Sequence, residues 1–115
     1  MTLHRYHWFG IFILIGLFGL STAHAESLHD AAFKGDLSQV KRLIAKGVDV
    51  NTIQNDGATA LMLAVNKGRG SIIQILLAKG ADVNAKTNKG WTALVAAKKM
   101  RREKIVQMLI KAGAK

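Results

Sequence analysis

The sequence contains no cysteine and no proline among its 115 residues, and it has only seven acidic residues against 17 lysines and arginines. Without cysteine the chain forms no disulfide bond and offers no N-terminal cysteine for attachment of a lipid. A chain of this length allows one small domain. The stability of that domain must therefore come from packing alone.

Catalytic and metal-binding residues are also scarce. After residue 25 the chain keeps one histidine, His29. A metal site needs several His, Cys or carboxylate ligands brought together, and the seven acids show no such spacing. Ser27, Ser38 and Ser71 lie near expected helix starts, where serine is favoured as a cap, and KGRGS at residues 67–71 lacks the spacing of a phosphate-binding loop. We therefore predict no catalytic residue, no cofactor, no metal site and no enzymatic activity.

The first 25 residues differ from the rest and have the features of a secretory signal peptide. Arg5 precedes an uncharged apolar run, Trp8–Leu20, and Ala23 and Ala25 form the small-x-small pattern of a signal-peptidase site. The run is shorter than the roughly 20 residues that a helix needs to span a bilayer. We predict a signal peptide over residues 1–25 with cleavage after Ala25, a periplasmic or secreted protein, and no stable membrane insertion after cleavage. The alternative is a retained N-terminal anchor.

The remaining residues repeat at an interval of 33. The motif KGVDVN occupies residues 46–51, the similar KGADVN occupies residues 79–84, and the given sequence ends with KAGAK. A fixed period of this size is typical of stacked supersecondary units. Further residues match at the same interval: Leu28, Leu61 and Leu94; Ala31, Ala64 and Ala97; Leu43, Leu76 and Leu109; Gly47, Gly80 and Gly113.

Each unit predicts two short helices followed by a turn. In the middle unit, ATALMLAVNKG predicts an apolar helix that ends at Gly68. SIIQILLAKG predicts a second helix, with apolar residues at helical spacing and Gly80 just past its end, where a left-handed glycine caps the last turn. The following ADVNAKTNKG is rich in residues that form turns, so the chain is expected to reverse there.

The middle unit, DGATALMLAVNKGRGSIIQILLAKGADVNA at residues 56–85, resembles an ankyrin repeat. The resemblance covers residues 26–115 as three repeats, at about 26–54, 55–87 and 88–115. It implies an all-α ankyrin solenoid of three helix-turn-helix repeats with short hairpin loops, preceded by the signal peptide. The residues that match the family pattern are Gly57, Thr59, Leu61, Ala64, Gly68, Ile73, Leu76, Leu77, Gly80, Ala81, Asp82, Val83, Asn84 and Ala85.

The chain departs from the family pattern at two positions of the first helix. The usual proline is replaced by Ala60 and Ala93. The usual histidine is replaced by Met62 and Val95, and only the first repeat keeps it, as His29. The threonine-to-histidine hydrogen bonds that usually brace these turns are therefore expected to be weak or absent.

The outer repeats differ from the middle one as caps should. Asp30 and Lys98 stand where the middle repeat has leucine and valine. A solenoid needs polar faces at its two ends, so we interpret the outer repeats as caps, with neutral drift as the alternative. Arg101 stands at the position of Gly68, and we expect it to adopt a left-handed turn at a cost of roughly 1 kcal/mol.

The resemblance implies binding of another protein through the hairpin tips and the exposed side of the first helix of each repeat. Trp91 and Phe33 are the only aromatic residues after residue 25, and Trp91 at a tip is a candidate anchor. The alternatives are that Trp91 folds back over its own repeat and that Phe33 shields the first helix pair. The candidate tip residues are Ile53, Asn55, Asp56, Ala58, Lys86, Asn88, Lys89 and Trp91, and the candidate helix residues are Phe33, Lys34, Asn66, Lys67, Lys99 and Met100.

The charge bears on the class of partner. Residues 26–115 hold 16 of the 17 basic residues and all seven acidic ones, a net charge of about +9. Lys34, Lys67, Lys86, Lys89 and Lys99 fall on the expected binding side and favour an acidic protein partner. Other basic residues fall on the opposite side, so the alternative is a basic peripheral envelope protein that binds anionic surfaces without a specific protein partner. We expect a monomer and no nucleic-acid partner, because no nucleic-acid-binding motif is present.

Two roles are suggested by the resemblance to bacterial proteins of this type. One is an accessory factor for a periplasmic enzyme. The other is an immunity protein that blocks a toxin delivered to the envelope. The residues themselves do not separate the two roles, whereas a neighbouring toxin gene or a neighbouring catalase-type gene would.

Overall fold

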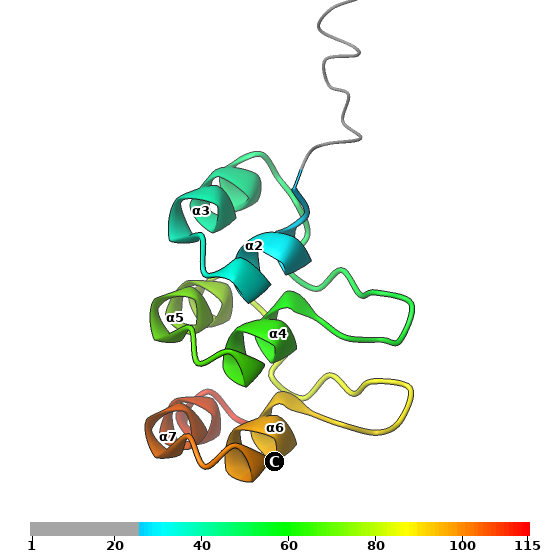
Figure 1. Ribbon diagram of the computed structural model, residues 1–115, viewed down its shortest axis with the longest axis vertical. Helices are drawn as coiled ribbons and strands as arrows, with labels where there is room; N and C mark the ends of the chain where they lie inside the picture. The colour runs from blue at the N-terminus through cyan, green and yellow to red at the C-terminus, as the bar shows by residue number, and fades with distance from the viewer. Residues whose placement is uncertain (1–25) are drawn as a thin grey trace, which may run out of the picture.

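The computed structural model describes residues 26–115, so the predicted signal peptide lies outside the described residues. The described part contains six helices and one isolated β-bridge, between Ile53 and Thr59. The helices pair into three helix-turn-helix units that stack along one axis, as the repeat predicts (Figure 1). Their bounds are α2 Leu28–Lys34, α3 Leu37–Ala45, α4 Ala60–Asn66, α5 Gly70–Ala78, α6 Ala93–Lys99 and α7 Glu103–Lys111.

The stack has two layers of helices. The first helices of the repeats, α2, α4 and α6, form one layer in which α4 contacts both neighbours, and α3, α5 and α7 form the other (Figure 1). The two long loops, between α3 and α4 and between α5 and α6, project together from the side of the first layer (Figure 1). The loop tips and the first helices therefore border one side of the molecule.

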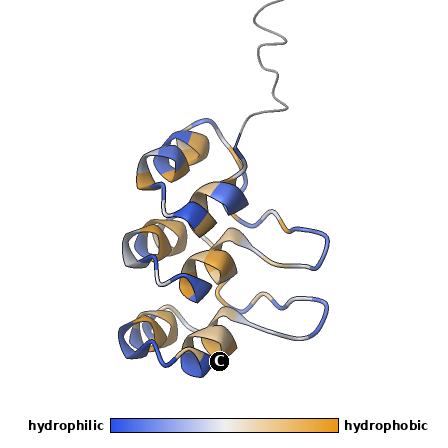
Figure 2. Ribbon diagram, in the orientation of Figure 1, coloured by the Kyte–Doolittle hydropathy of each residue, from blue (hydrophilic) through white to orange (hydrophobic). Residues whose placement is uncertain are grey.

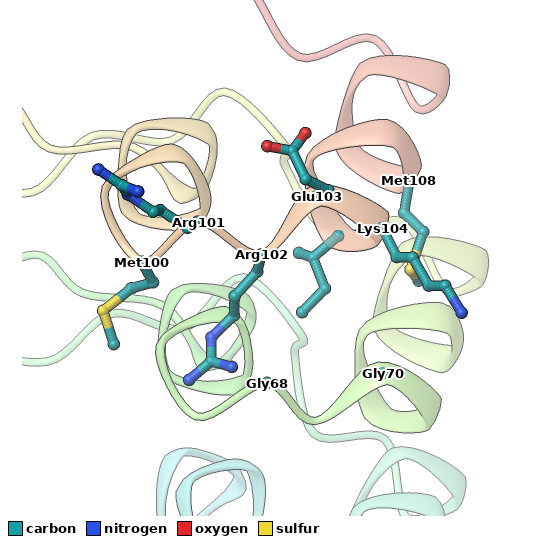
Figure 3. A pocket seen from close by; sticks show the side chains of 9 residues that line it. Gly68, Gly70, Met100, Arg101, Arg102, Glu103, Lys104 and Met108 are labelled. Atoms are coloured by element: carbon teal, nitrogen blue, oxygen red, sulfur yellow. The ribbon is translucent and has the colours of Figure 1, made fainter.

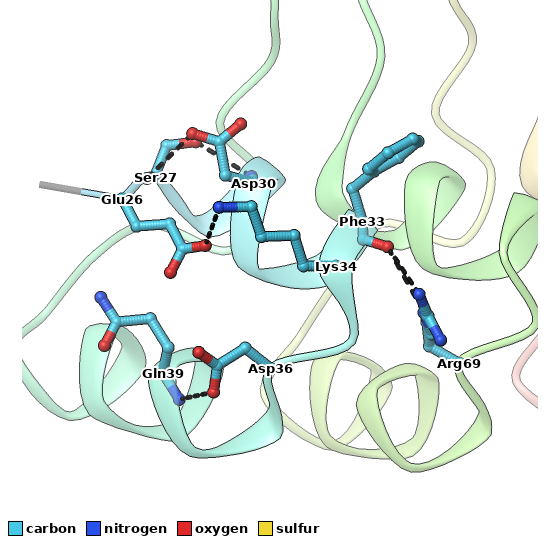
Figure 4. A network of polar contacts seen from close by, with 8 residues as sticks. All are labelled: Glu26, Ser27, Asp30, Phe33, Lys34, Asp36, Gln39 and Arg69. Carbon is cyan, nitrogen blue, oxygen red and sulfur yellow. Dashed lines mark hydrogen bonds and ion pairs between the residues drawn. The ribbon is translucent and has the colours of Figure 1, made fainter. Parts of the chain in front are cut away.

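Short polar side chains fix several helix starts. Ser27 accepts a hydrogen bond from the main-chain N–H of Asp30 at 3.1 Å, and the Asp30 carboxylate accepts one from the N–H of Ser27 at 3.4 Å (Figure 4). This capping box satisfies two N–H groups that α2 itself leaves without partners. Asp36 caps α3 in a similar way. Ser38 and Ser71 lie inside α3 and α5, so of the three serines expected near helix starts only Ser27 is a cap.

Threonines cap α4 and α6. Thr59 and Thr92 each accept a hydrogen bond from the main-chain N–H three residues later, at 3.3 and 3.2 Å. Neither bond uses a histidine, in agreement with the substitutions in the sequence. His29 is buried, and its Nε2 lies 3.2 Å from the carbonyl oxygen of Ala58. His29 therefore connects the first repeat to the second instead of bracing its own turn.

The apolar core runs through all three repeats and is densest in the middle one. Figure 2 shows α4 and α5 as largely apolar, whereas the loop tips are hydrophilic. Burying one large aliphatic side chain contributes about 1.5–3 kcal/mol. The buried apolar residues run from Leu28 to Leu109, so residues 26–115 enclose a core of their own. The largest fully buried side chains are Leu61, Val65, Ile72, Ile73 and Leu76 of the middle repeat, with Val40 and Leu109 from the outer ones.

One arginine at each interface between repeats reaches back to the preceding repeat. Arg69 donates from Nε and Nη2 to the carbonyl oxygen of Phe33, at 3.3 and 3.2 Å (Figure 4). Arg102 donates from Nη2 to the carbonyl oxygen of Asn66 at 3.0 Å. Both carbonyls lie at the C-terminal ends of first helices, where carbonyl groups lack partners within the helix and a positive charge is favourable.

Each of these arginines lies against a residue in the left-handed conformation. Gly35 has a φ of 84° and Gly68 a φ of 68°. A Cβ atom on these glycines would come within 2.8 Å and 2.7 Å of the guanidinium groups of Arg69 and Arg102. Glycine is therefore favoured both by the backbone conformation and by the close approach of the guanidinium group. The matched residue of the last repeat is Arg101, with a φ of 55°, which confirms the predicted left-handed turn.

The asparagines of the repeated KG-DVN motif also connect neighbouring repeats. Asn51 donates from Nδ2 to the carbonyl of Gly80 at 3.1 Å and accepts at Oδ1 from the N–H of Asp82 at 2.7 Å. Asn84 makes the two matching bonds to the last repeat, at 3.1 and 3.0 Å. The KG-DVN motif thus forms a turn within one repeat, and its asparagine binds the backbone of the next.

Candidate protein-binding surface

Each long loop folds into a hairpin that is closed by main-chain hydrogen bonds. In the first hairpin the N–H of Gln54 donates to the carbonyl of Ala58 at 2.9 Å. In the second, the N–H of Thr87 donates to the carbonyl of Trp91, also at 2.9 Å. Each hairpin is therefore closed by its own hydrogen bond, and the two bonds lie at matched positions of the repeat.

The two hairpin tips are bonded to each other. The main-chain N–H of Asn88 donates to the carbonyl of Asp56 at 2.9 Å, and its side-chain amide donates to the carbonyl of Asn55 at 3.1 Å. A Cβ atom on Gly57 would lie only 3.1 Å from the main-chain nitrogen of Asn88, so the two backbones are closely packed. These contacts hold the candidate residues of both tips at a fixed spacing.

All but one of the candidate residues are exposed. Ala58 is only 6% exposed, which contradicts its expected place on an exposed tip. Its N–H bonds to the Asp56 carboxylate at 3.0 Å and its carbonyl lies against His29, so the residue faces the interface between repeats. The exposed candidates are Phe33, Lys34, Ile53, Asn55, Asp56, Asn66, Lys67, Lys86, Asn88, Lys89, Trp91, Lys99 and Met100.

Phe33 and Lys67 come together from neighbouring repeats. The amino group of Lys67 lies 4.6 Å from the centroid of the Phe33 ring, a cation–π contact. Phe33 stays 44% exposed, and Arg69 holds its carbonyl. Lys34 turns to Glu26 instead and forms an ion pair at 3.2 Å (Figure 4). An exposed ring with an adjacent positive charge therefore lies between the first two repeats.

Trp91 forms the second pair of this kind. The amino group of Lys99 lies 5.1 Å from the centroid of the indole ring, and Trp91 as a whole is 39% exposed. Lys99 belongs to α6 of the same repeat, so Trp91 packs partly on its own repeat and still presents a face to solvent. The ring borders a hollow of about 330 Å³ between the two hairpins, lined by Asp56, Thr87, Asn88, Lys89 and Trp91.

A larger hollow of about 520 Å³ lies at the turn between α6 and α7 (Figure 3). Here the Nε atom of Arg102 is buried without a hydrogen-bond partner, while its Nη2 binds Asn66. The side chain of Arg101 points away from that of Arg102 (Figure 3). The stretch KKMRRE is the one sequence signal that marks this region. The lining residues are Gly68, Gly70, Met100, Arg101, Arg102, Glu103, Lys104, Ile105 and Met108.

The chemistry of the described surface suits contact with a macromolecule. Within residues 26–115 no three histidine, aspartate or glutamate residues lie close enough to hold a metal ion. In the same part of the chain, no helix has both the length and the apolar character needed to cross a bilayer. The candidate surface presents the exposed rings of Phe33 and Trp91, several lysines and side-chain amides on the hairpins. Tryptophan is among the residues that most often anchor protein interfaces.

Comparison with known proteins agrees with this description. A family model described as ankyrin repeats, in three copies, matches residues 28–115 and so covers all six helices. A search of curated proteins finds no matching sequence. With three units stacked through matched contacts and a family model that spans all of them, the chain belongs to the ankyrin repeat family, whose repeats are protein-interaction modules.

Proposed function

We propose that this chain is an exported module that binds an acidic partner protein through its hairpin tips and first helices. The proposal is supported above all by the two exposed aromatic rings, Phe33 and Trp91, each with a lysine amino group within reach of its face. A ring supplies apolar contact area at low cost in side-chain entropy, and the adjacent lysine attracts a carboxylate. Together they favour a partner that offers acidic and apolar side chains side by side.

The hollow next to Trp91 is the best place for an anchor of the partner. Its volume of about 330 Å³ is enough for one large side chain. Its walls come from two hairpins that Asn88 holds together, so little ordering is needed when a partner binds. Lys89 at its edge supplies a positive charge and Asp56 supplies hydrogen-bond acceptors.

The charges of this surface favour fast capture of an acidic protein. Lys34 is paired with Glu26, and that pair is the only ion pair in the described residues. Lys67, Lys86, Lys89 and Lys99 therefore carry charges that no carboxylate of the described chain neutralises. Unpaired charges of one sign raise the association rate with a partner of the opposite sign and make that rate depend on salt.

The binding proposal is tested by capture of the partner from an envelope extract with immobilised residues 26–115. Trp91→Ala should lower capture about 30-fold, because a central aromatic anchor is worth about 2 kcal/mol or more. Alanine already stands at the matched position 58, so the substitution should not disturb the fold. Gln74→Ala is the control, since Gln74 is exposed on α5 in the other layer. Equal capture by wild type, Trp91→Ala and Phe33→Ala would refute the binding surface.

Export and biological role are tested separately. The intact mass of the protein isolated from its native envelope should begin at Glu26, and a retained Met1 would contradict cleavage. The captured partner then distinguishes the two roles. An accessory factor should preserve or raise the activity of an envelope enzyme, whereas an immunity protein should abolish the activity of a toxin. A partner whose activity does not change in either direction would contradict both roles.

A further inference from the structure

The net charge of the chain rises steeply along the stack. Residues 26–54 contain four acidic and four basic residues, residues 55–87 contain two and four, and residues 88–115 contain one and eight. The net charge of the three repeats is therefore 0, +2 and +7. The single ion pair of the described residues, Lys34 with Glu26, belongs to the first repeat, so no carboxylate pairs with any basic residue of the last repeat.

Exposed apolar side chains are concentrated in the same repeat. Of the six large hydrophobic residues that are exposed in the described chain, four lie in the last repeat: Trp91 and Met100, which belong to the candidate partner surface, and Val95 and Ile110, which do not. Val95 is 42% exposed, whereas Met62 at the matched position of the middle repeat is only 8% exposed. Ile110 is 47% exposed, whereas the matched Leu77 is partly buried and packs against the core. The face that joins the middle repeat to its successor is thus open in the last repeat.

The residue types at this face show that it is not built as another repeat interface. Lys98 stands where Val65 is fully buried, and a lysine there could not be buried without a partner. Arg101 replaces the glycine against which the arginine of a following repeat would lie. We define the C-terminal end face by Val95, Lys98, Arg101 and Ile110.

We propose that the C-terminal end face docks the protein on an anionic lipid bilayer. Clusters of lysine and arginine attract anionic headgroups, and aliphatic side chains between them enter the headgroup boundary. Interfaces with proteins are enriched in aromatic residues, but the end face has no aromatic member and instead combines two basic residues, Lys98 and Arg101, with two exposed aliphatic ones, Val95 and Ile110. The composition of the end face therefore favours lipid over an acidic protein.

This proposal is independent of the proposed partner surface. The partner surface is formed by the hairpin tips and the first helices, including Lys99 of α6, whereas Val95, Lys98, Arg101 and Ile110 belong to the end face alone. Docking at the end face leaves the first two repeats and the first hairpin away from the bilayer, so a partner could still reach Phe33 and Lys67. Phe33→Ala should weaken capture of a partner without changing adsorption to vesicles.

The test is co-sedimentation of residues 26–115 with phosphatidylcholine vesicles that contain phosphatidylglycerol, compared with vesicles of phosphatidylcholine alone. Wild type should bind the anionic vesicles only. One basic residue near the surface contributes about fivefold in binding, so Lys98→Glu with Arg101→Glu should weaken binding about 25-fold or more. Lys41→Glu with Arg42→Glu is the matched control, because both residues are exposed on α3 and the change in net charge is identical.

Three outcomes would overturn the proposal. Wild type that stays in solution with anionic vesicles contradicts docking, and an equal loss in the two double variants reduces the effect to net charge. Binding of wild type to immobilised polyglutamate without binding to vesicles assigns the end face to an acidic polypeptide. Circular dichroism verifies that each variant is folded. If the double variant unfolds, Lys98→Glu against Lys41→Glu provides the same comparison with one charge each, and Val95→Asn should weaken vesicle binding but not polyglutamate binding.

Discussion

The guanidinium group of Arg69 binds the main-chain carbonyl of Phe33 through two hydrogen bonds, of 3.3 and 3.2 Å, across 36 positions of the chain. This contact ties the backbone beneath one of the two exposed rings to the second repeat. The position of the Phe33 ring on the candidate surface therefore depends on an interface between repeats. Stability and binding share this structural element.

Arg69→Ala should destabilise the protein by about 1.5–3 kcal/mol, because a hydrogen bond from a charged group is lost and a helix-terminal carbonyl loses its partner. Urea unfolding followed by circular dichroism measures the change. Arg42→Ala serves as the control, since Arg42 is an exposed arginine of α3, and it should stay within about 0.5 kcal/mol of wild type. A loss no larger than that of Arg42→Ala would show that the interface arginine does not stabilise the stack.

Arg101→Gly should stabilise the protein by about 1 kcal/mol, because Arg101 has a φ of 55° and glycine adopts this conformation without the steric cost of a Cβ atom. Arg101→Ala removes the same charge and keeps the Cβ atom, so it should give no comparable gain. The midpoints of urea unfolding of the two variants are to be compared. Equal midpoints would mean that charge, and not backbone strain, sets the effect.

Gly68→Ala should cost more than Gly80→Ala although both glycines have positive φ values, 68° and 93°. The new Cβ at position 68 would lie 2.7 Å from the Arg102 guanidinium, whereas nothing lies within 4 Å of one at position 80. Gly80→Ala should lose about 1 kcal/mol from backbone strain alone. Gly68→Ala should lose about 1 kcal/mol more, because the Arg102 guanidinium must shift and its bond to Asn66 is weakened. Thermal unfolding of both variants tests the order, and a reversed order would contradict the close packing of Arg102.

Asn51→Ala should destabilise the protein more than Asn84→Ala. Each asparagine makes two hydrogen bonds to the next repeat, worth about 1 kcal/mol each. The bonds of Asn51 join the first repeat to the middle one, whereas those of Asn84 reach Gly113 and Lys115, the last residues described. Unfolding free energies from urea titrations measure both losses. Equal losses would show that the last residues are held as firmly as the interior of the stack.

Much of the fold could be predicted from the period of the sequence. A match at intervals of 33 residues fixes which residues occupy equivalent places, so two helices per unit and the left-handed turn at Arg101 follow from the family pattern. The polar substitutions Asp30 and Lys98 likewise fall at exposed positions of the outer repeats. These features depend on residues close in sequence or on the repeat itself.

The errors and omissions arise where matched positions have different neighbours. Ala58 and Trp91 are equivalent in the repeat, but Ala58 is buried and Trp91 is exposed. Ala58 contacts His29 of the preceding repeat, a contact that periodicity alone does not describe. The arginine contacts do not follow from the period either, because they join residues 36 positions apart, which is one repeat plus three. One feature of the sequence does indicate these contacts. An arginine follows the turn residue in the second and third repeats, whereas the first repeat has Asp36 there.

The direction of the contacts between repeats has a consequence for how the molecule is made. The carbonyl of Phe33 accepts its hydrogen bonds from Arg69, and the side chain of Asn51 bonds to the main chain of Gly80 and Asp82, so both depend on the following repeat. A chain that emerges N-terminus first therefore cannot complete its first repeat until most of the second has emerged. The hydrogen bonds of each repeat are complete only once the next repeat is present, so the stack is stabilised in order from the N-terminus to the C-terminus.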